Sequence, residues 1–197
     1  MNGRRWEVLC CGTEARARAS AAALSRIGRR AAALGKSAPD DPALAGLLVQ
    51  ADVAYVAAMD DEDLPALARI AEQAGAAGTV LALDADALAP DDAVALADIV
   101  FFDEAAFRCR FDASPGPAAL RRALALGPHT VMVTLEGAGA MAACAASFAQ
   151  QSAMRPGRTE AFHAAFLDAW LDGVALDEAL MRAGALAGQS GAGGRLR

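Results

Sequence analysis

One short segment brings together residue types that bind anions and accept protons. It runs from Pro156 to Glu160, with the sequence Pro-Gly-Arg-Thr-Glu, and leads into an apolar helical pattern over residues 161–170. The first turn of a helix presents unpaired N–H groups and the positive end of the helix dipole, which together attract anions. Arg158 could then contact a phosphate, and Glu160 would place a carboxylate beside it. In the alternative that needs no ligand, Thr159 caps the helix, Glu160 complements its dipole and Arg158 is solvated.

A glycine-containing turn, Glu136-Gly-Ala-Gly-Ala140, follows an apolar strand pattern over residues 129–135 and imitates the dinucleotide fingerprint G-x-G-x-x-A. A true fingerprint needs a following strand that ends in an acidic residue. The residues that come next, from Ser147 to Gly157, make a poor strand pattern. We therefore favour a tight turn between two antiparallel strands over an NAD site.

Two charged clusters each admit two interpretations. The acidic run from Asp60 to Asp63 could bind a metal, but four consecutive helical residues cannot all point one way. Helix capping and dipole compensation are therefore favoured for this run. Arg16, Arg18 and Arg26 lie on the first predicted helix and form either a solvated face or a patch that contacts phosphate.

The composition argues against several functional classes. The chain has 197 residues, a net charge of −6 and an aromatic share of 5%. The acidic balance argues against nucleic-acid binding, which usually needs a basic surface. Four cysteines lie in apolar or mixed segments without a C-x-x-C pair, so we expect buried free thiols in a reducing compartment. They are Cys10, Cys11, Cys109 and Cys144. With two histidines and no Cys/His cluster, a structural zinc site is not expected.

Signals for export or membrane insertion are not evident. The apolar run after Arg4 and Arg5 is short and contains Glu7, so no signal peptide is predicted. The most apolar long segment, residues 138–153, is too short for a spanning helix and contains Gly, Ser and Gln. We therefore expect a cytoplasmic protein with no membrane partner.

Strand and helix patterns alternate along the chain and must position these residues. Strand patterns occur at residues 6–11, 30–34, 52–58, 78–83, 98–102 and 129–135. Helical patterns occur at residues 13–27, 43–50, 60–74, 90–96, 116–126, 161–170 and 176–189. This alternation predicts an α/β fold with a mostly parallel sheet flanked by helices. We expect one domain over residues 1–190 and a flexible Gly-rich tail at 191–197.

The first predicted helix has a cap at Thr13 and a stop at Gly28. Its packed face is expected to consist of apolar residues at helical spacing, namely Ala19, Ala22, Ala23 and Ile27.

Four stretches resemble the carbohydrate kinases of the ribokinase (PfkB) family, and they occur in that family's order. Ala97-Asp-Ile-Val-Phe-Phe-Asp-Glu resembles the family's ADIVxxNxxE strand and helix start, and Val131-Met-Val-Thr-Leu-Glu-Gly-Ala-Gly-Ala resembles its VVVTLGxxGA strand and turn. Gly157-Arg-Thr-Glu-Ala-Phe-His-Ala-Ala-Phe stands where the family has GAGDxFxAAF. Leu171 to Ala183 resembles the helix pair that follows, and a weaker similarity covers Ala21 to Gly35.

The resemblance implies a ribokinase-like fold and ATP-dependent phosphoryl transfer to a hydroxyl of a sugar or related small molecule, with Mg²⁺. In the family, the Asp of GAGD takes the proton from the sugar hydroxyl, and the glycine-rich turn before it holds the phosphoryl group. Carried over to this sequence, the resemblance implies Glu160 as the catalytic base and Asp103 at the metal. It also implies phosphate binding by Gly157, Arg158 and Thr159, and nucleotide binding by Thr134 and Gly137.

The sequence departs from the family pattern at these same positions. Glu160 is one methylene longer than Asp, while Arg158 and Thr159 replace Ala and Gly. Asp103 and Ala106 stand at the Asn and Glu of the family's NxxE motif. The active site is thus degenerate, and two functions stay open: a kinase, weak or inactive, or a non-catalytic ribokinase-like binding protein.

The chain also leaves little room for the small β-sheet lid that covers the sugar in full family members. Between Gly12 and Gly35 there is space for one helix and a weak strand. We therefore expect the lid to be reduced or absent. A missing lid leaves a sheet edge uncovered, which favours self-association into a homodimer.

Overall fold

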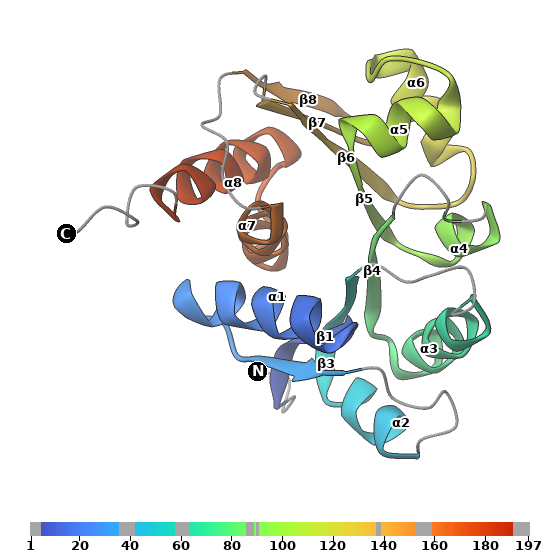
Figure 1. Ribbon diagram of the computed structural model, residues 1–197, viewed down its shortest axis with the longest axis vertical. Helices are drawn as coiled ribbons and strands as arrows, with labels where there is room; N and C mark the ends of the chain where they lie inside the picture. Colours follow the sequence, from blue (N-terminus) through green and yellow to red (C-terminus); the bar gives the residue numbers. More distant parts are fainter. Residues whose placement is uncertain are drawn as a thin grey trace.

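Eight strands form a single sheet at the centre of the molecule (Figure 1). The computed structural model describes residues 5–35, 42–57, 64–85, 89, 91–136, 139–152 and 159–190. The strands are β1 (Trp6–Gly12), β2 (Ala31–Leu34), β3 (Ala51–Ala57), β4 (Val80–Asp84), β5 (Ile99–Asp103), β6 (Thr130–Leu135), β7 (Gly139–Cys144) and β8 (Phe148–Gln151). Their order across the sheet is β2-β1-β3-β4-β5-β6-β7-β8.

The six strands from β2 to β6 in this order run parallel, which confirms the predicted mostly parallel sheet. The chain reverses after β6, where Leu135 pairs with Gly139, so the predicted turn between antiparallel strands is also confirmed. β8 then pairs antiparallel with β7. The sequence pattern does not predict β8, because it is an edge strand in which Ala149 alone is fully buried.

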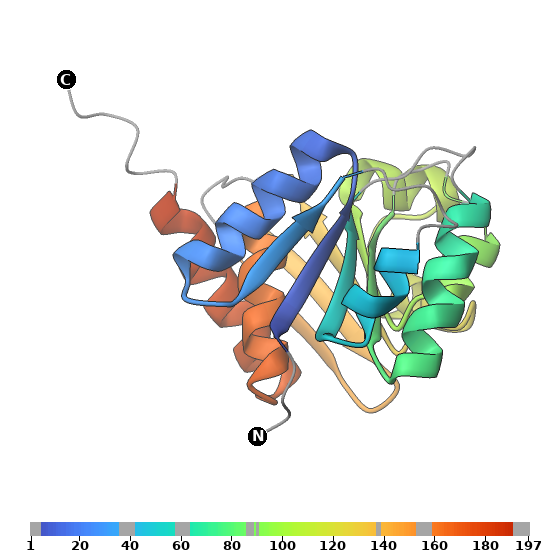
Figure 2. The same ribbon diagram turned by 90° about the horizontal axis from the view of Figure 1, so that it is seen from below.

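Helices cover both faces of the sheet. On one face lie α1 (Glu14–Arg26), α7 (Thr159–Leu171) and α8 (Leu176–Ser190), as Figure 2 shows from a second direction. The other face carries α2 (Pro42–Leu48), α3 (Leu64–Ala77), α4 (Asp91–Leu96), α5 (Glu104–Phe111) and α6 (Pro117–Leu124) (Figure 1). The predicted α/β architecture with flanking helices is therefore confirmed.

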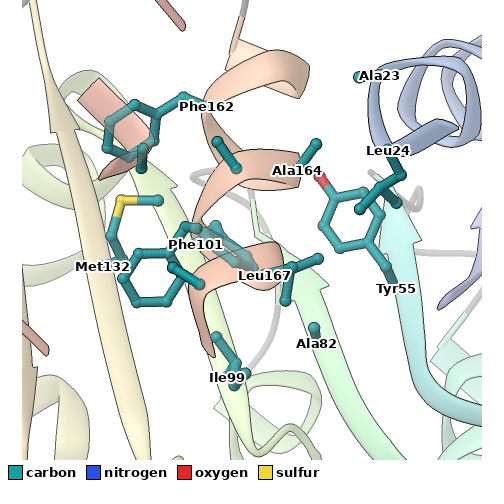
Figure 3. Packing of buried hydrophobic residues seen from close by; sticks show 14 of the residues in the cluster. Ala23, Leu24, Tyr55, Ala82, Ile99, Phe101, Met132, Phe162, Ala164 and Leu167 are labelled. Carbon is teal, nitrogen blue, oxygen red and sulfur yellow. The ribbon is translucent and has the colours of Figure 1, made fainter. Parts of the chain in front are cut away.

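The core consists of two apolar layers, one on each side of the sheet. Alternate residues of a strand enter opposite layers, so in β3 Val53 and Tyr55 face α1 and α7 while Ala54 and Val56 face the other helices. Because both faces are covered, the strands are apolar nearly throughout rather than alternating with polar residues. Figure 3 shows Phe101 of β5 beneath α7, with Tyr55 on β3, two strands away, and its hydroxyl oxygen directed toward the helix.

The packed face predicted for α1 is wrong in part. The buried residues of α1 are Ala17, Ser20, Ala21, Ala23 and Leu24, whereas Ala19 and Ala22 are exposed. Alanine occurs all around this helix and so does not define a face, and the larger Leu24 decides which side packs. Thr13 occupies the N-cap position as predicted, but its side chain makes no capping hydrogen bond.

Some expectations concern residues that the structure does not describe, and others need correction. The acidic run at residues 60–63 and the tail at 191–197 lie outside the described residues, and α3 extends to Ala77, past its predicted end. Cys109 is exposed, so the expectation of buried thiols is wrong for this residue, although Cys10 and Cys11 are buried. Within the described ranges every strand belongs to the one sheet, and no second sheet forms a lid. None of the helices seen there is long and apolar enough to cross a membrane.

Candidate functional site

The carboxyl ends of the parallel strands meet at one edge of the sheet, and the first turn of α7 lies at this edge. Sheet order reverses at β1, because β2 lies on one side of it and β3 on the other. In open α/β sheets, ligands bind outside the carboxyl ends of the strands. Glu160 stands in the first turn of α7, and His163, one turn later, has its Nδ1 atom 4.0 Å from the carboxylate of Asp84 at the carboxyl end of β4.

The structure brings Asp103 and Thr134 together at this edge. They are paired across β5 and β6, at the carboxyl ends of both strands. The Asp103 carboxylate caps α5, because Oδ1 accepts a hydrogen bond from the Ala106 N–H at 2.6 Å. Thr134 donates its hydroxyl proton to the Phe102 carbonyl, with an Oγ1–O distance of 3.4 Å. Among the described residues no hydrogen bond to the second oxygen of Asp103, Oδ2, is seen, and the Thr134 hydroxyl can still accept a hydrogen bond.

Thr159 and Glu160 form the start of α7. Thr159 is exposed and is the first residue of the helix, so it lies one step further into the helix than the predicted capping position. Glu160 is half-buried, and its charge acts on both Tyr55 and His163. Gly157, Arg158 and Gly137 lie outside the described residues.

Four further polar residues gather at this edge, and the sequence reasoning missed their connection. The Tyr55 hydroxyl lies 2.9 Å from Nδ1 of His163, and Arg16 lies 3.7 Å from the carboxylate of Asp84. Asp84 follows an apolar strand, and Tyr55 is the single tyrosine of the chain within another. The positions of these residues in or after apolar strands are visible in the sequence. The sequence does not show which strands are neighbours in the sheet, so it could not reveal that these side chains meet.

Burial controls the ionisation of the two deepest groups of this cluster. Removal from water lowers the pKa of His163 below its ordinary value of 6.5, although the nearby carboxylates of Asp84, Glu160 and Asp103 act in the opposite direction. Burial likewise raises the pKa of Tyr55 well above 10.0, and the charge of Asp84 adds to this rise. Both side chains are therefore neutral at physiological pH.

The three arginines of α1, which the sequence suggested as one solvated face or one phosphate-binding patch, lie in different surroundings. The Arg16 guanidinium reaches Asp84 at the carboxyl edge, whereas Arg18 pairs with Glu14 on the exposed surface of its own helix. Arg26 is exposed in the last turn of α1. The three arginines do not form one patch, and Arg16 is the member that lies at the candidate site.

The other end of α7 is anchored at the opposite edge of the sheet. Arg29 donates from Nε to the Asp168 carboxylate at 2.5 Å and from NH1 to the Glu7 carboxylate at 2.8 Å. It also donates to the Asp168 carbonyl and the Asp172 carboxylate. Since Glu7 lies near the amino end of β1, this cluster fixes the distance between α7 and the sheet far from Glu160.

The oxygen donors at the carboxyl edge fit Mg²⁺ bound mainly through a nucleotide. Within the described part of the chain, no group of three or more His, Cys, Asp or Glu side chains could hold a metal by itself. Mg²⁺ usually keeps several waters and takes one or two carboxylates together with substrate phosphates. The free oxygen of Asp103 meets that requirement.

The sequence matches no family model and no curated protein. Solved structures, in contrast, share its fold. A PfkB protein from Polaromonas sp. JS666 superimposes with a TM-score of 0.73 over 95% of this chain and 96% of the other, at 14% identity. Arabidopsis thaliana ribokinase complexed with ribose and ATP gives a TM-score of 0.63 at 20% identity, over 76% of this chain and 52% of the ribokinase. A ribokinase II from E. coli, in complex with ATP and Mg²⁺, gives 0.60 at 17% identity, over 73% and 53%.

The chain thus spans about half the length of these two ribokinases. Identities this low establish the fold and not the activity. The strand order, the helices on both faces and these superpositions agree with one another, and the chain has the ribokinase-like fold of PfkB proteins.

Proposed function

We propose that the protein transfers a phosphoryl group from ATP to a hydroxyl of a small molecule, a sugar or a related compound. One observation carries the proposal. Glu160, a carboxylate in the first turn of α7, lies at the carboxyl edge of a ribokinase-like sheet, where its charge acts on the polar cluster around Asp84. A carboxylate at that place can accept the proton of an acceptor hydroxyl.

The remaining roles are assigned to residues that lie along the carboxyl edge of the sheet or close to it in the sequence. Gly157, Arg158 and Thr159 bind the phosphates, and the N–H groups at the start of α7 add to this binding. Thr134 and Gly137 line the nucleotide on the side of β6, and Asp103 holds Mg²⁺ through its free carboxylate oxygen.

When bound, ATP with Mg²⁺ supplies the transferable phosphoryl group and neutralises the charge that develops on it. The chain's own contribution is positioning. Glu160 receives the proton of the hydroxyl, and Asp103 orients the metal from the end of β5. Two of the structural neighbours are complexes with ATP, and one of these also holds Mg²⁺, which supports this assignment.

The length of the Glu160 side chain predicts a slow enzyme. Its carboxylate lies one methylene further from the backbone than that of an Asp at this position. A misplacement of about 1 Å can cost on the order of 100-fold in rate. We therefore expect turnover well below that of an enzyme with the shorter carboxylate.

The test combines binding and turnover. Thermal unfolding is followed with ATP and Mg²⁺ together and with each alone, and a panel of sugars and other hydroxyl compounds is then assayed for ATP-dependent phosphorylation. We expect a rise in unfolding temperature with the pair and transfer to at least one acceptor. Stabilisation without transfer to any acceptor would contradict the kinase proposal and leave the non-catalytic binding protein.

We also infer that two copies of the chain associate. The apolar strand β2 (Ala31–Leu34) lies at the edge of the sheet, and edge strands can pair with other chains. Sedimentation velocity is expected to show a dimer that dissociates on dilution. A single monomeric species at all concentrations would refute this inference.

A further inference from the structure

We propose that Tyr55 and His163 are positioning residues, which hold the first turn of α7 in place and so set the position of the Glu160 carboxylate. This inference rests on the proposed function, because it concerns the same site. Tyr55 lies outside the motifs that carry the ribokinase resemblance, His163 stands at a variable position (x) of the GAGDxFxAAF pattern, and neither needs to touch the substrate.

The two side chains form a buried polar contact within an apolar layer. Tyr55 and His163 are each 1% exposed, and the Tyr55 hydroxyl lies 2.9 Å from Nδ1 of His163. The imidazole ring stacks on Phe101 of β5, with 4.3 Å between ring centroids and an interplanar angle of 27°. His163 is therefore fixed by β3 through a hydrogen bond and by β5 through its ring.

The number of buried polar atoms left without a hydrogen-bond partner decides which residue donates this hydrogen bond. If the Tyr55 O–H donates to Nδ1, both of those atoms are satisfied and only the N–H at Nε2 lacks a partner among the described residues. If Nδ1–H donates instead, the tyrosine proton and the Nε2 lone pair are both left without one. Buried unpaired polar groups are costly, so Tyr55 is the donor and His163 carries its proton on Nε2.

Charged groups act on His163 from four elements, while β3 contributes the neutral Tyr55. Asp84 approaches from β4, Asp103 from β5, Arg16 from α1 and Glu160 from α7 itself. Burial outweighs the carboxylates, so the imidazole stays neutral and Nδ1 remains free to accept the hydrogen bond. The positioning role thus needs a histidine, or another acceptor, that does not become charged.

The rest of the N-terminal half of α7 offers no comparable anchor. Its buried residues there are Phe162, Ala164, Ala165 and Phe166, whose apolar side chains have no hydrogen-bonding groups. Directional contacts described for α7 occur at two places, at His163 and at the Arg29 cluster near its other end. Glu160 precedes His163 by three residues, so both lie on the same side of the helix. A rotation that His163 prevents would carry the carboxylate with it.

Three substitutions test the role by activity. His163→Leu removes the acceptor, Tyr55→Phe removes the donor, and His163→Asn keeps an acceptor oxygen close to the place of Nδ1. We expect kcat to fall about 10- to 100-fold in the first two, with KM for ATP changed less than about threefold, and to return most of the way in His163→Asn. Equal kcat in all three variants and the wild type would overturn the proposal. So would a rise in KM alone, or an equal loss in the asparagine variant.

Two measurements on the protein without substrates test the inference even if no acceptor is ever phosphorylated. Ring ¹⁵N NMR of His163 is expected to show the tautomer with the proton on Nε2. Amide exchange in the first two turns of α7 should quicken at least tenfold in Tyr55→Phe, while exchange near Arg29 stays unchanged. The other tautomer, or equal exchange along the whole helix, would overturn the positioning role. Absent turnover with these two results intact would refute only the proposed function.

Discussion

Replacement of Arg29 by methionine tests how α7 is held on the sheet. Methionine keeps the length and apolar character of the stem but removes all donors. In the wild-type protein the Arg29 side chain is 16% exposed, and its partners Glu7 and Asp168 are 21% and 19% exposed. The substitution therefore removes the cation that joins these two largely buried carboxylates, although the Arg30 guanidinium stays 3.6 Å from Glu7.

The expected cost follows from this burial. Removal of one partner from a fully buried ion pair costs about 3–5 kcal/mol. Here the carboxylates retain some contact with water, and Glu7 keeps the hydrogen bond from the Arg30 N–H at 2.9 Å. We expect a loss of about 2–3 kcal/mol in the free energy of unfolding, which lowers the unfolding temperature of a chain of this size by about 5–10 °C.

The assay is urea denaturation together with calorimetry, with Arg18→Met as the matched control. Arg18 forms an exposed pair with Glu14 within α1, so its loss should cost about 0.3–0.5 kcal/mol. The difference between the variants should shrink in acid. Burial opposes ionisation of Glu7, but hydrogen bonds from Arg30 and Arg29 outweigh it and lower its pKa below 4.5, so this contribution is present above pH 4.5 and is lost as the pH falls further. Equal stability of Arg29→Met and the wild type, or an equal loss in the control, would refute the reasoning.

Three further predictions concern other parts of the molecule. Gly139→Ala should destabilise the hairpin strongly, because Gly139 has a φ of +109° and a Cβ atom there would overlap the Gln151 carbonyl; an unchanged unfolding temperature would contradict this. Cys144 should react with a thiol reagent before Cys11, because the Ser147 hydrogen bond lowers the pKa of Cys144, whereas burial raises the pKa of Cys11 to about 12; mass spectrometry after brief labelling decides the order. Stability should fall as the pH drops below 6.5, because unfolded His163 binds a proton more readily than the folded state does; the same fall in His163→Asn would count against this.

The strands and helices that form the layers of the fold are predictable from the sequence, because the residue patterns that specify them lie within short segments. Apolar runs such as Val53 to Ala57 can be buried on both faces only in a covered parallel sheet, and the predicted boundaries of β3 differ from the observed ones by one residue. The face of α1 is not predictable in the same way. Alanine at Ala19 and Ala22 tolerates either burial or exposure, so only tertiary packing decides.

The candidate site is predictable to a smaller extent. The position of Glu160 follows from the motif at the start of α7, and the pairing of Asp103 with Thr134 follows from the neighbouring strand ends. The contact of Tyr55 with His163 spans 108 residues and depends on strand order, which no local pattern contains. Sequence reasoning therefore placed Glu160, Asp103 and Thr134 at the candidate site, where their roles stay predictions, and missed the buried pair of Tyr55 and His163.

Phosphoryl transfer by variants of Glu160 tests the central claim most directly. Wild type, Glu160→Gln and Glu160→Asp are compared for transfer of labelled γ-phosphate from ATP to an acceptor, with Glu72→Gln on the exposed side of α3 as control. The account predicts transfer in the wild type and the control, none in Glu160→Gln, and faster transfer in Glu160→Asp, whose carboxylate is one methylene closer to the backbone. Unchanged transfer in Glu160→Gln would remove Glu160 as the base and contradict the account.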